Sequence, residues 1–254
     1  MMLPLNCYIP HPRYVTQGLE DIHHHTCHCD DATITVVQAL DEAQRRGLYW
    51  LNFTAHVRAS TPHQHVQKFV DDVNTAAVDY PAIAVSVSLE TKILDTRGNL
   101  DLPSWYSPGS DVNFLLIADH QVTTPAGPTT PKETVALVRS GEETESSVTE
   151  WIVDGMCAAM VNYPQNVLAH PLSVFPKIGV GADSLSADIF DRISRTAVET
   201  GTAIDVNSKW CAPGQRLISC CIRDGVPVLS GTDTHHTEQP LDLYLPAGGE
   251  TGAV

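Results

Sequence analysis

Short apolar runs recur along this chain, and their alternation with helical patterns limits the folds available to it more than any other feature. The runs are rich in Val, Ile, Leu and Ala and lie at residues 19–23, 48–54, 82–89, 113–118, 166–169, 202–206 and 226–230. Their brevity and composition are typical of buried parallel strands. We therefore expect each run to form one strand of a parallel sheet.

Helical patterns lie between these runs. At residues 32–46, the side chains of Val36, Val37, Leu40 and Ala43 fall on one face, and Gly47 marks the end of the helix. Similar patterns cover residues 64–78, 147–161, 184–200 and 214–224. Alternation of strands and helices on this scale predicts an α/β fold whose parallel sheet curls into a barrel.

The length of 254 residues suits a single large domain with its own hydrophobic core. We expect residues 1–18 to form an N-terminal extension, residues 19–238 the barrel domain and residues 239–254 a loosely ordered C-terminal tail. Residues 121–147 interrupt the alternation, because they are rich in Thr, Pro, Gly and Glu and lack a clear period. A loop or lid inserted into the barrel domain is the structure expected there.

The formal net charge of −15 argues against nonspecific binding to DNA or RNA. An anionic substrate stays compatible with this acidity, because bound metal ions reverse the local charge. The cysteines number 7, an odd count, and the first residues contain no signal-like segment, so we expect a cytoplasmic protein with reduced thiols. No apolar stretch approaches the roughly 20 residues of a membrane span. The oligomeric state stays open.

Residues that commonly bind metals lie at the ends of the predicted strands. All but one of the runs deliver such a residue at or just past their C-terminal end: His23 and His25, His56, Glu90, His120, His170, and Asp233 with His235. In a parallel α/β barrel, the carboxyl ends of the strands meet at one face, and active sites are built there. These residues are therefore expected to converge on one site.

Two of these segments carry ligands that are two residues apart. Side chains alternate along a strand with period two, so His23 and His25 point to the same side. Asp233 and His235 repeat this arrangement with a carboxylate. A single histidine at a strand end is usually an ordinary hydrogen-bonded residue, but the complete set indicates a metal site. Imidazole and carboxylate donors without an obligatory thiolate suit zinc, manganese or iron.

The ordered set of motifs resembles the PHP superfamily, which is named for polymerase and histidinol phosphatase domains, and looks most like its histidinol phosphatases. The motifs are Asp21-Ile22-His23-His24-His25-Thr26, Cys29-Asp30-Asp31-Ala32, Phe53-Thr54-Ala55-His56, Leu89-Glu90-Thr91-Lys92, Ala169-His170-Pro171 and Gly231-Thr232-Asp233-Thr234-His235. They span residues 19–235, nearly the whole chain. No single motif is decisive, whereas their order is highly specific.

The resemblance implies a single-domain, distorted (β/α)7 barrel of the TIM type that binds two or three divalent metal ions, Zn, Mn or Fe. It assigns one ion to His23, His25, Glu90 and Asp233. Glu90 would bridge to a second ion that His120 and His170 hold. A third ion would lie among Asp31, His56 and His235.

Two positions depart from the family pattern. Asp31 stands where the family often has His, and Ala55 stands where it often has Asp. Asp31 can still bind a metal, and Asp30 is an alternative ligand one residue away. Ala55 cannot form a side-chain hydrogen bond, so a group that supports a ligand would be missing.

The remaining histidines and cysteines have weaker cases. Cys27 and Cys29 beside His28 could bind a metal, but no second cysteine pair lies at zinc-finger spacing. The other candidates are expected to have packing, surface or helix-starting roles: Cys220 and Cys221, His24 and His236, and His63 and His65.

These features predict a metal-dependent phosphoesterase, either a phosphatase or a phosphodiesterase, that hydrolyses a small phosphorylated molecule with metal-activated hydroxide. Arg58, Lys92 and Lys209 are the candidates to hold phosphate oxygens, because each follows a predicted strand. Asp233 or His235 would protonate the leaving group. Residues 121–147 follow His120 directly, so we expect them to overhang the site and to influence selectivity. Their glutamates would suit a cationic substrate.

Two other readings stay open. The same metal cluster could hydrolyse a C–N bond, as amidohydrolases do on related barrels, or support iron-dependent oxidation, because fold alone does not fix chemistry. A metal-stabilised scaffold without activity is the third hypothesis, and the complete ligand set argues against it.

Overall fold

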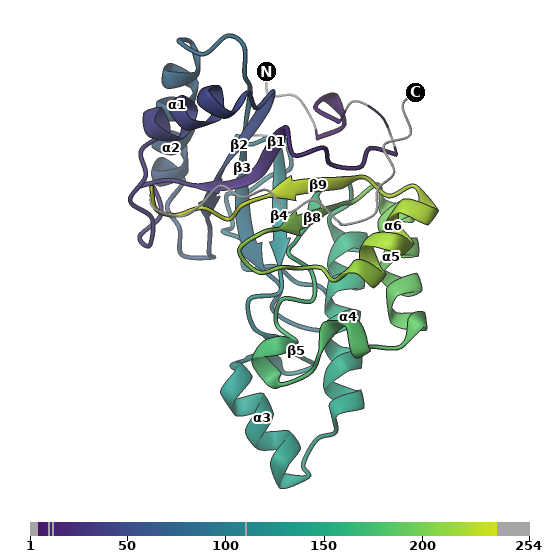
Figure 1. Ribbon diagram of the computed structural model, residues 1–254. Coiled ribbons are helices and arrows are strands. Elements are labelled where there is room, and N and C mark those ends of the chain that lie inside the picture. The colour runs from purple at the N-terminus through teal and green to yellow at the C-terminus, as the bar shows by residue number, and fades with distance from the viewer. Residues whose placement is uncertain (1–4, 10, 12, 110, 238–254) are drawn as a thin grey trace.

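The computed structural model describes residues 5–9, 11, 13–109 and 111–237. Figure 1 shows its elements: η1 (Leu5–Cys7), β1 (Glu20–His25), α1 (Val36–Arg46), β2 (Trp50–His56), α2 (His63–Ala77), β3 (Ala84–Lys92), β4 (Phe114–Ala118), β5 (Val122–Thr124), β6 (Gly127–Thr129), α3 (Pro131–Ser140), α4 (Glu145–Asn162), β7 (Val167–Ala169), η2 (Pro176–Ile178), η3 (Ala182–Ser184), α5 (Ala187–Thr200), β8 (Ala203–Asn207), α6 (Gln215–Asp224) and β9 (Val228–Gly231). Every predicted strand and helix is present, with ends that differ by a few residues.

Seven strands form one parallel sheet in the order β1-β2-β3-β4-β7-β8-β9. The sheet curls so that β1 meets the residues after β9. There, the N–H of His25 donates to the carbonyl of Thr234 at 2.9 Å, and the N–H of Asp233 donates to the carbonyl of His23 at 2.7 Å. The predicted single-domain, distorted (β/α)7 barrel is therefore confirmed.

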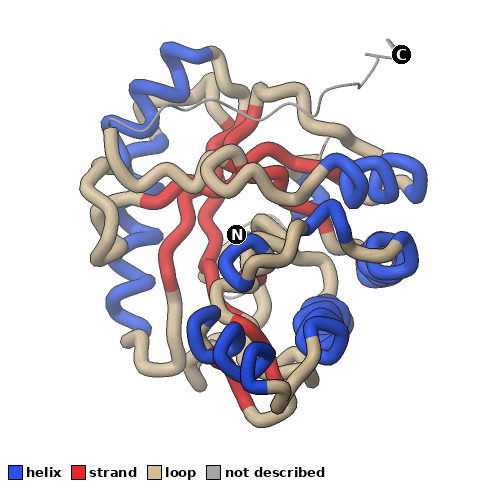
Figure 2. The backbone as a smooth tube through the Cα atoms, turned by 60° about the horizontal axis from the view of Figure 1, so that its bottom comes forward, coloured by secondary structure: helices blue, strands red, loops and turns tan. Residues whose placement is uncertain are grey.

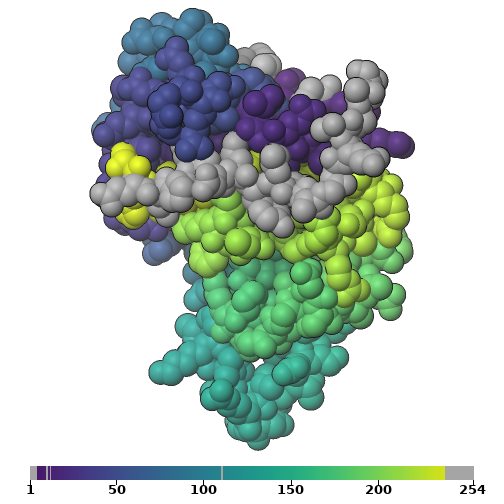
Figure 3. All heavy atoms as spheres, viewed as in Figure 1, coloured from purple at the N-terminus to yellow at the C-terminus, as the bar shows by residue number. Residues whose placement is uncertain are grey.

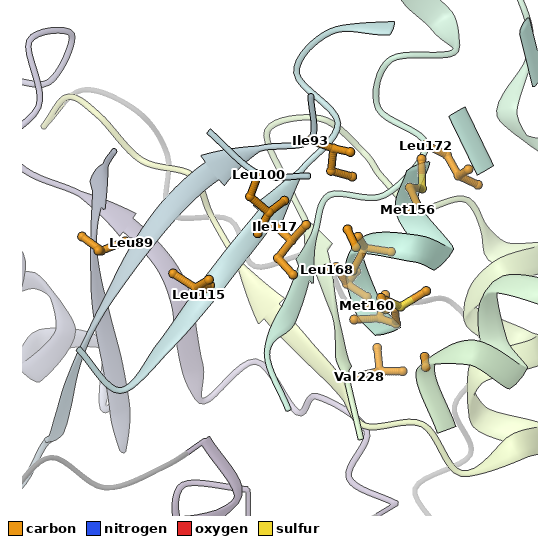
Figure 4. Close-up of a cluster of buried hydrophobic side chains, with 14 of the residues drawn as sticks. Leu89, Ile93, Leu100, Leu115, Ile117, Met156, Met160, Leu168, Leu172 and Val228 are labelled. Carbon is orange, nitrogen blue, oxygen red and sulfur yellow. The ribbon is translucent and has the colours of Figure 1, made fainter. Parts of the chain in front are cut away.

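The helices cover the outside of the barrel. Figure 2 shows the strands at the centre of the molecule and the helices around them. Apolar side chains of the strands pack against those of α1, α2, α4, α5 and α6 in one continuous core. Figure 4 shows part of it, where strand residues such as Ile117 and Leu168 lie near Met156 and Met160 of α4. This layer fixes the positions of the strand ends.

Residues of the expected N-terminal extension cover the amino ends of the strands. Leu5 belongs to a second apolar cluster inside the barrel, and Tyr8 stacks on Trp50 with ring centroids 5.2 Å apart. Val15 forms a parallel bridge with Val228 of β9. The opposite, carboxyl face of the barrel is left for the site.

Residues 121–147, predicted to form a loop or lid inserted into the barrel domain, contain regular secondary structure. This segment forms the hairpin of β5 and β6, the helix α3 and the first turn of α4. Helix α3 lies at the lower end of the molecule in Figure 1, and the same segment forms the lower tip of the surface in Figure 3. Its helix begins at a capping box between Thr130 and Glu133 and ends at Gly141 with φ +79°.

The remaining expectations concern membrane spans and the C-terminal tail. Within the described residues, no helix is both long and apolar enough to cross a membrane. The expected tail, residues 239–254, lies outside the described part of the chain.

Candidate metal centre

Glu90 lies at the centre of the side chains that meet at the carboxyl ends of the strands. It belongs to β3, and its side chain is buried. Its Oε1 lies 3.0 Å from Nε2 of His120 and 3.1 Å from Nε2 of His170. Its Oε2 lies 3.0 Å from Nε2 of His56, 3.4 Å from that of His25 and 3.5 Å from that of His23. Imidazoles from several strand ends thus surround one carboxylate.

His23 and His25 point to the same side of β1, with their Nε2 atoms 3.0 Å apart. Asp233, which follows β9, places Oδ1 3.3 Å from Nε2 of His25 and 3.8 Å from Nε2 of His23. His24 points elsewhere, and its Nδ1 lies 3.1 Å from Oδ2 of Asp21. The structure therefore brings together the residues predicted to hold the first ion, while their binding of metal stays a prediction.

The backbone is strained at two of the predicted ligands. His170 has φ +31° and Asp233 has φ +51°, values that residues with a side chain rarely adopt. Strain of this kind persists where the surrounding structure enforces it, and it gathers at functional sites. The two positions therefore support the assignment of a site to this end of the barrel.

The histidines fit divalent cations because the hydrogen bonds of their Nδ1 atoms leave the Nε2 atoms free to bind. Nδ1 of His23 donates to Oδ2 of Asp205 at 3.0 Å, and Nδ1 of His170 lies 3.1 Å from Oγ of Ser173, which itself donates to Asp119. A proton on Nδ1 leaves the lone pair of Nε2 facing Glu90. Two facing acceptors need positive charge between them, from a metal ion or from an additional proton.

The pKa shifts of the metal-free site agree with this need. Burial lowers the pKa of His23, but the carboxylates of Glu90 and Asp233 outweigh it and raise the value to about 9. Burial also lowers the pKa of His170, but Asp119 and Glu90 outweigh this effect and raise the value to about 10. Burial raises the pKa of Glu90, yet the neighbouring histidines, His120 first, hold it well below its usual range. The carboxylates therefore favour positive charge within the cluster, carried by protons or by metal ions.

Asp31, His56 and His235 form a neighbouring group that could hold a further ion. Oδ1 of Asp31 lies 3.4 Å from Nδ1 of His56, and its Oδ2 lies 3.7 Å from Nε2 of His235. Burial and the charge of His25 lower the pKa of His235 to about 4. The alternative ligand Asp30 lines a hollow beside this group.

Cys29 contacts two of the predicted ligands, His25 and His56. Its buried Sγ lies 3.4 Å from Nδ1 of His25 and accepts the N–H of His56 at 3.4 Å, and these three residues form another group that could hold a metal. Burial raises the pKa of the thiol, but the contacts with His25 and His56 lower it to about 6. Cys27 is exposed. Cys29 thus holds the backbone of His56 by a hydrogen bond, whereas the side chain of the neighbouring Ala55 cannot form one.

Three further residues near the site carried no signal in the sequence. Asp205 comes from β8, the strand for which no ligand was predicted. Trp210 donates from Nε1 to Oδ2 of Asp233 at 2.6 Å. The ammonium group of Lys177 lies 4.1 Å from the centroid of the Trp210 ring. An aspartate inside a strand and a tryptophan in a loop acquire these roles only through the fold.

A hollow of about 410 Å³ opens onto the cluster. It is lined by Asp31, His56, Val57, Arg58, Glu90, Lys92, His120, Gln121, Lys209, Trp210, Asp233 and His235. All three residues predicted to bind phosphate are therefore at its wall. Nζ of Lys92 lies 3.5 Å from Asp101 and 3.3 Å from Gln121, and Nζ of Lys209 lies 3.1 Å from Asp233.

The segment 121–147 contributes only its first residue, Gln121, to the wall of this hollow. Its glutamates have other contacts: Glu133 caps α3, Glu142 accepts from Ser140, and Glu143 accepts from Ser147. The expected influence of these glutamates on a cationic substrate therefore has no contact that supports it. Another hollow lies at the amino ends of the strands, and none of the described residues that line it has a titratable side chain.

Comparison with known proteins identifies a shared fold. No family model matches the chain, and no curated protein matches it. The structure of histidinol phosphate phosphatase from Lactococcus lactis, complexed with zinc, L-histidinol and phosphate, is similar with a TM-score of 0.59 and 14% identity, over 87% of this chain and 88% of that one. This likeness shows that the two chains have the same fold.

Two other solved structures are more distant. N-isopropylammelide isopropylaminohydrolase from Burkholderia multivorans matches with a TM-score of 0.43 and 14% identity, over 84% of this chain and 61% of that one. An HpcH/HpaI aldolase from Desulfitobacterium hafniense matches with a TM-score of 0.41 and 9% identity, over 91% of each chain.

Proposed function

We propose that this chain is a metal-dependent phosphoesterase that acts on a small molecule. The observation that carries the proposal is the pairing of a buried donor cluster with cations at the wall of the same hollow. Arg58, Lys92 and Lys209 all line it, although the chain has 15 Lys and Arg against 30 Asp and Glu. A cationic wall beside metal ligands suits a substrate that carries negative charge.

The nine predicted ligands fit two or three divalent ions, which would lower the pKa of a water molecule and neutralise charge on a phosphoryl oxygen. They are His23, His25, Asp31, His56, Glu90, His120, His170, Asp233 and His235. Zinc is the first candidate, because the Lactococcus lactis phosphatase of the same fold was solved with zinc and phosphate.

The side chains of the wall would orient the phosphoryl group. Lys92 and Lys209 are held in place by neighbouring carboxylates and would direct their ammonium groups to the phosphoryl oxygens. Fixed positive groups stabilise the negative charge that grows during displacement, and they need no rearrangement at that moment. Arg58 would serve the same purpose on the side of His56.

The proton that the leaving oxygen needs would come from a group of three side chains, those of Asp233, His235 and Lys209. Nζ of Lys209 lies 3.1 Å from Oδ2 of Asp233 and 3.3 Å from Nδ1 of His235. The three groups therefore lie within hydrogen-bond reach of one another at the wall of the hollow. Such an arrangement can pass a proton to an alkoxide as the ester bond breaks.

The test is turnover by protein of known metal content. Purified protein is loaded with Zn, Mn or Fe and assayed on phosphomonoesters, phosphodiesters, amides and lactams. We expect phosphoester cleavage that His23→Ala abolishes, whereas the exposed His11→Ala, used as the control, retains it. Cleavage of amides or lactams alone would contradict the proposal. No turnover of any of these substrates, together with a lower stability of the folded His23→Ala protein, would favour a scaffold role instead.

A further inference from the structure

A second hollow adjoins the metal cluster on the side of β1 and β2. It also measures about 410 Å³ and is lined by His28, Cys29, Asp30, Asp31, His56, Arg58, Ser60, Thr61, Pro62 and His65. Asp31, His56 and Arg58 line both hollows. Two spaces of similar size therefore lie on either side of the contact between Asp31 and His56, whose Oδ1 and Nδ1 are 3.4 Å apart.

The charge of the second hollow differs from that of the first. Among the described residues that line it, Asp30 and Asp31 are acidic. Apart from histidines, Arg58 is the one basic residue there. Both of its helix-side imidazoles are engaged, since Nε2 of His28 lies 3.2 Å from Asp72 and Nε2 of His65 lies 2.9 Å from the carbonyl of His28. This wall thus offers carboxylates and the hydroxyl group of Ser60 to a ligand.

A phosphate held at the metal cluster would meet both hollows. The lysines lie on one side of it, at the ends of β3 and β8, and the loops after β1 and β2 lie on the other. A monoester carries one organic group and would fill one of these spaces. A diester carries two organic groups, one for each space, and binding sites for small molecules usually bury most of the surface of their ligand.

We propose, on the basis of the proposed function, that the substrate is a phosphodiester whose second alcohol is polar and either neutral or cationic. An anionic group would be repelled by Asp30, the carboxylate of the second hollow that is not among the nine proposed ligands. Hydrolysis adds the oxygen of water to phosphorus, breaks one P–O ester bond and releases one alcohol together with a phosphomonoester. The proton that water loses ends on the released alcohol.

A chromogenic series on the metal-loaded protein tests this substrate class. The probes are 4-nitrophenyl phosphate, bis(4-nitrophenyl) phosphate and 4-nitrophenyl phosphorylcholine, which share one leaving group. We expect kcat/KM for the phosphorylcholine diester to exceed that for the monoester by about tenfold or more. A monoester that is cleaved as fast or faster overturns the substrate class and leaves the phosphoesterase standing. Failure to cleave any probe overturns both.

A variant of the second hollow ties the preference to this space. Ser60→Trp places a large ring in the hollow at an exposed loop position, so we expect the ratio of diester to monoester kcat/KM to fall about tenfold. Ser219→Trp makes the same change on the exposed face of α6, away from both hollows, and is expected to keep the wild-type ratio. An unchanged ratio in folded Ser60→Trp protein contradicts the proposal.

Discussion

Nδ1 of His23 lies 3.0 Å from Oδ2 of Asp205, and both side chains are fully buried. The same carboxylate oxygen accepts the backbone N–H of His170 at 3.1 Å and Nδ2 of Asn207 at 3.1 Å. One oxygen on β8 therefore fixes the tautomer of a predicted ligand on β1 and the backbone of a predicted ligand after β7. Carboxylates behind metal-binding histidines commonly do this and also raise the basicity of the ligand.

Asp205→Asn is expected to weaken metal binding without removing a ligand. The amide has nearly the shape of the carboxylate but lacks its charge, and its nitrogen cannot accept the proton of Nδ1. Loss of such a supporting group typically costs about 10- to 100-fold in metal affinity. Competition for zinc against a chromophoric chelator measures the change.

Asp71→Asn is the matched control for this substitution, because Asp71 is exposed on α2 and far along the chain from the ligands. It should bind zinc as the wild type does. Equal zinc affinity in Asp205→Asn and Asp71→Asn would show that Asp205 does not support the ligand.

Gly231→Ala is expected to disturb the same contact from β9. An added Cβ would lie 2.3 Å from Oδ1 of Asp205 and 2.7 Å from Cβ of His23, so buried groups must shift. Overpacking of this kind typically costs about 1–3 kcal/mol of unfolding free energy. Urea denaturation of the metal-free protein measures it.

Gly181→Ala provides the comparison for that variant. Gly181 has φ −71°, and its added Cβ would have no neighbour closer than 3.6 Å. Its denaturation midpoint should stay near that of the wild type. If both alanine variants unfold at the same urea concentration, the close approach of Gly231 to Asp205 carries no energetic weight.

The sequence predicted most of the barrel because its signals are local. Each strand is a short apolar run, and each predicted ligand stands within a few residues of a strand end, where period two decides which side chains share a side. The structure brings the predicted residues together for this reason. Asp205 could not be found in this way, because its role depends on contacts with β1 and β7, which are distant in sequence.

Helix α3 shows the opposite case, in which local signals were present but did not suffice. Thr130, Glu133 and Gly141 mark its beginning and end. Its only fully buried residue among those described is Thr134, so the helix has no apolar stripe of the usual kind. A prediction based on hydrophobic periodicity cannot detect a helix that buries so little.

The metal-free protein is expected to lose stability as the pH rises above neutrality. Nearby carboxylates outweigh burial and raise the pKa of His23 to about 9 and that of His170 to about 10, and the pKa of His56 is also raised to about 9. A raised histidine pKa stabilises the fold fully below the unfolded value of about 6.5, and this stabilisation is lost as the pH rises through the folded value.

The thiol of Cys29 has the opposite effect on stability, but it accounts for only one proton. Its pKa is lowered to about 6, so it adds stability above the unfolded value and loses it as the pH falls through about 6. Four histidines with raised pKa values, His25 included, outweigh one thiol. The net slope between pH 7 and 9 should be on the order of 1 kcal/mol per pH unit or more. Thermal unfolding with a chelator present measures it. Constant or rising stability over this range would contradict the assignment.

Zinc uptake near neutral pH is expected to release protons from the buried cluster. The histidines around Glu90 hold protons in the metal-free protein at pH 7, because the pKa values of His23, His56 and His170 are raised to about 9 or 10. A metal ion needs the lone pairs that these protons occupy, so binding and deprotonation are coupled. Calorimetric titration in buffers of different ionisation enthalpy counts the protons. We expect about two or more per protein at pH 7 and fewer at pH 9.5.

The variant His23→Ala should release fewer protons than the wild type, whereas His11→Ala should release the same number. Zinc binding with no proton release at pH 7 would mean that the ion does not enter this cluster.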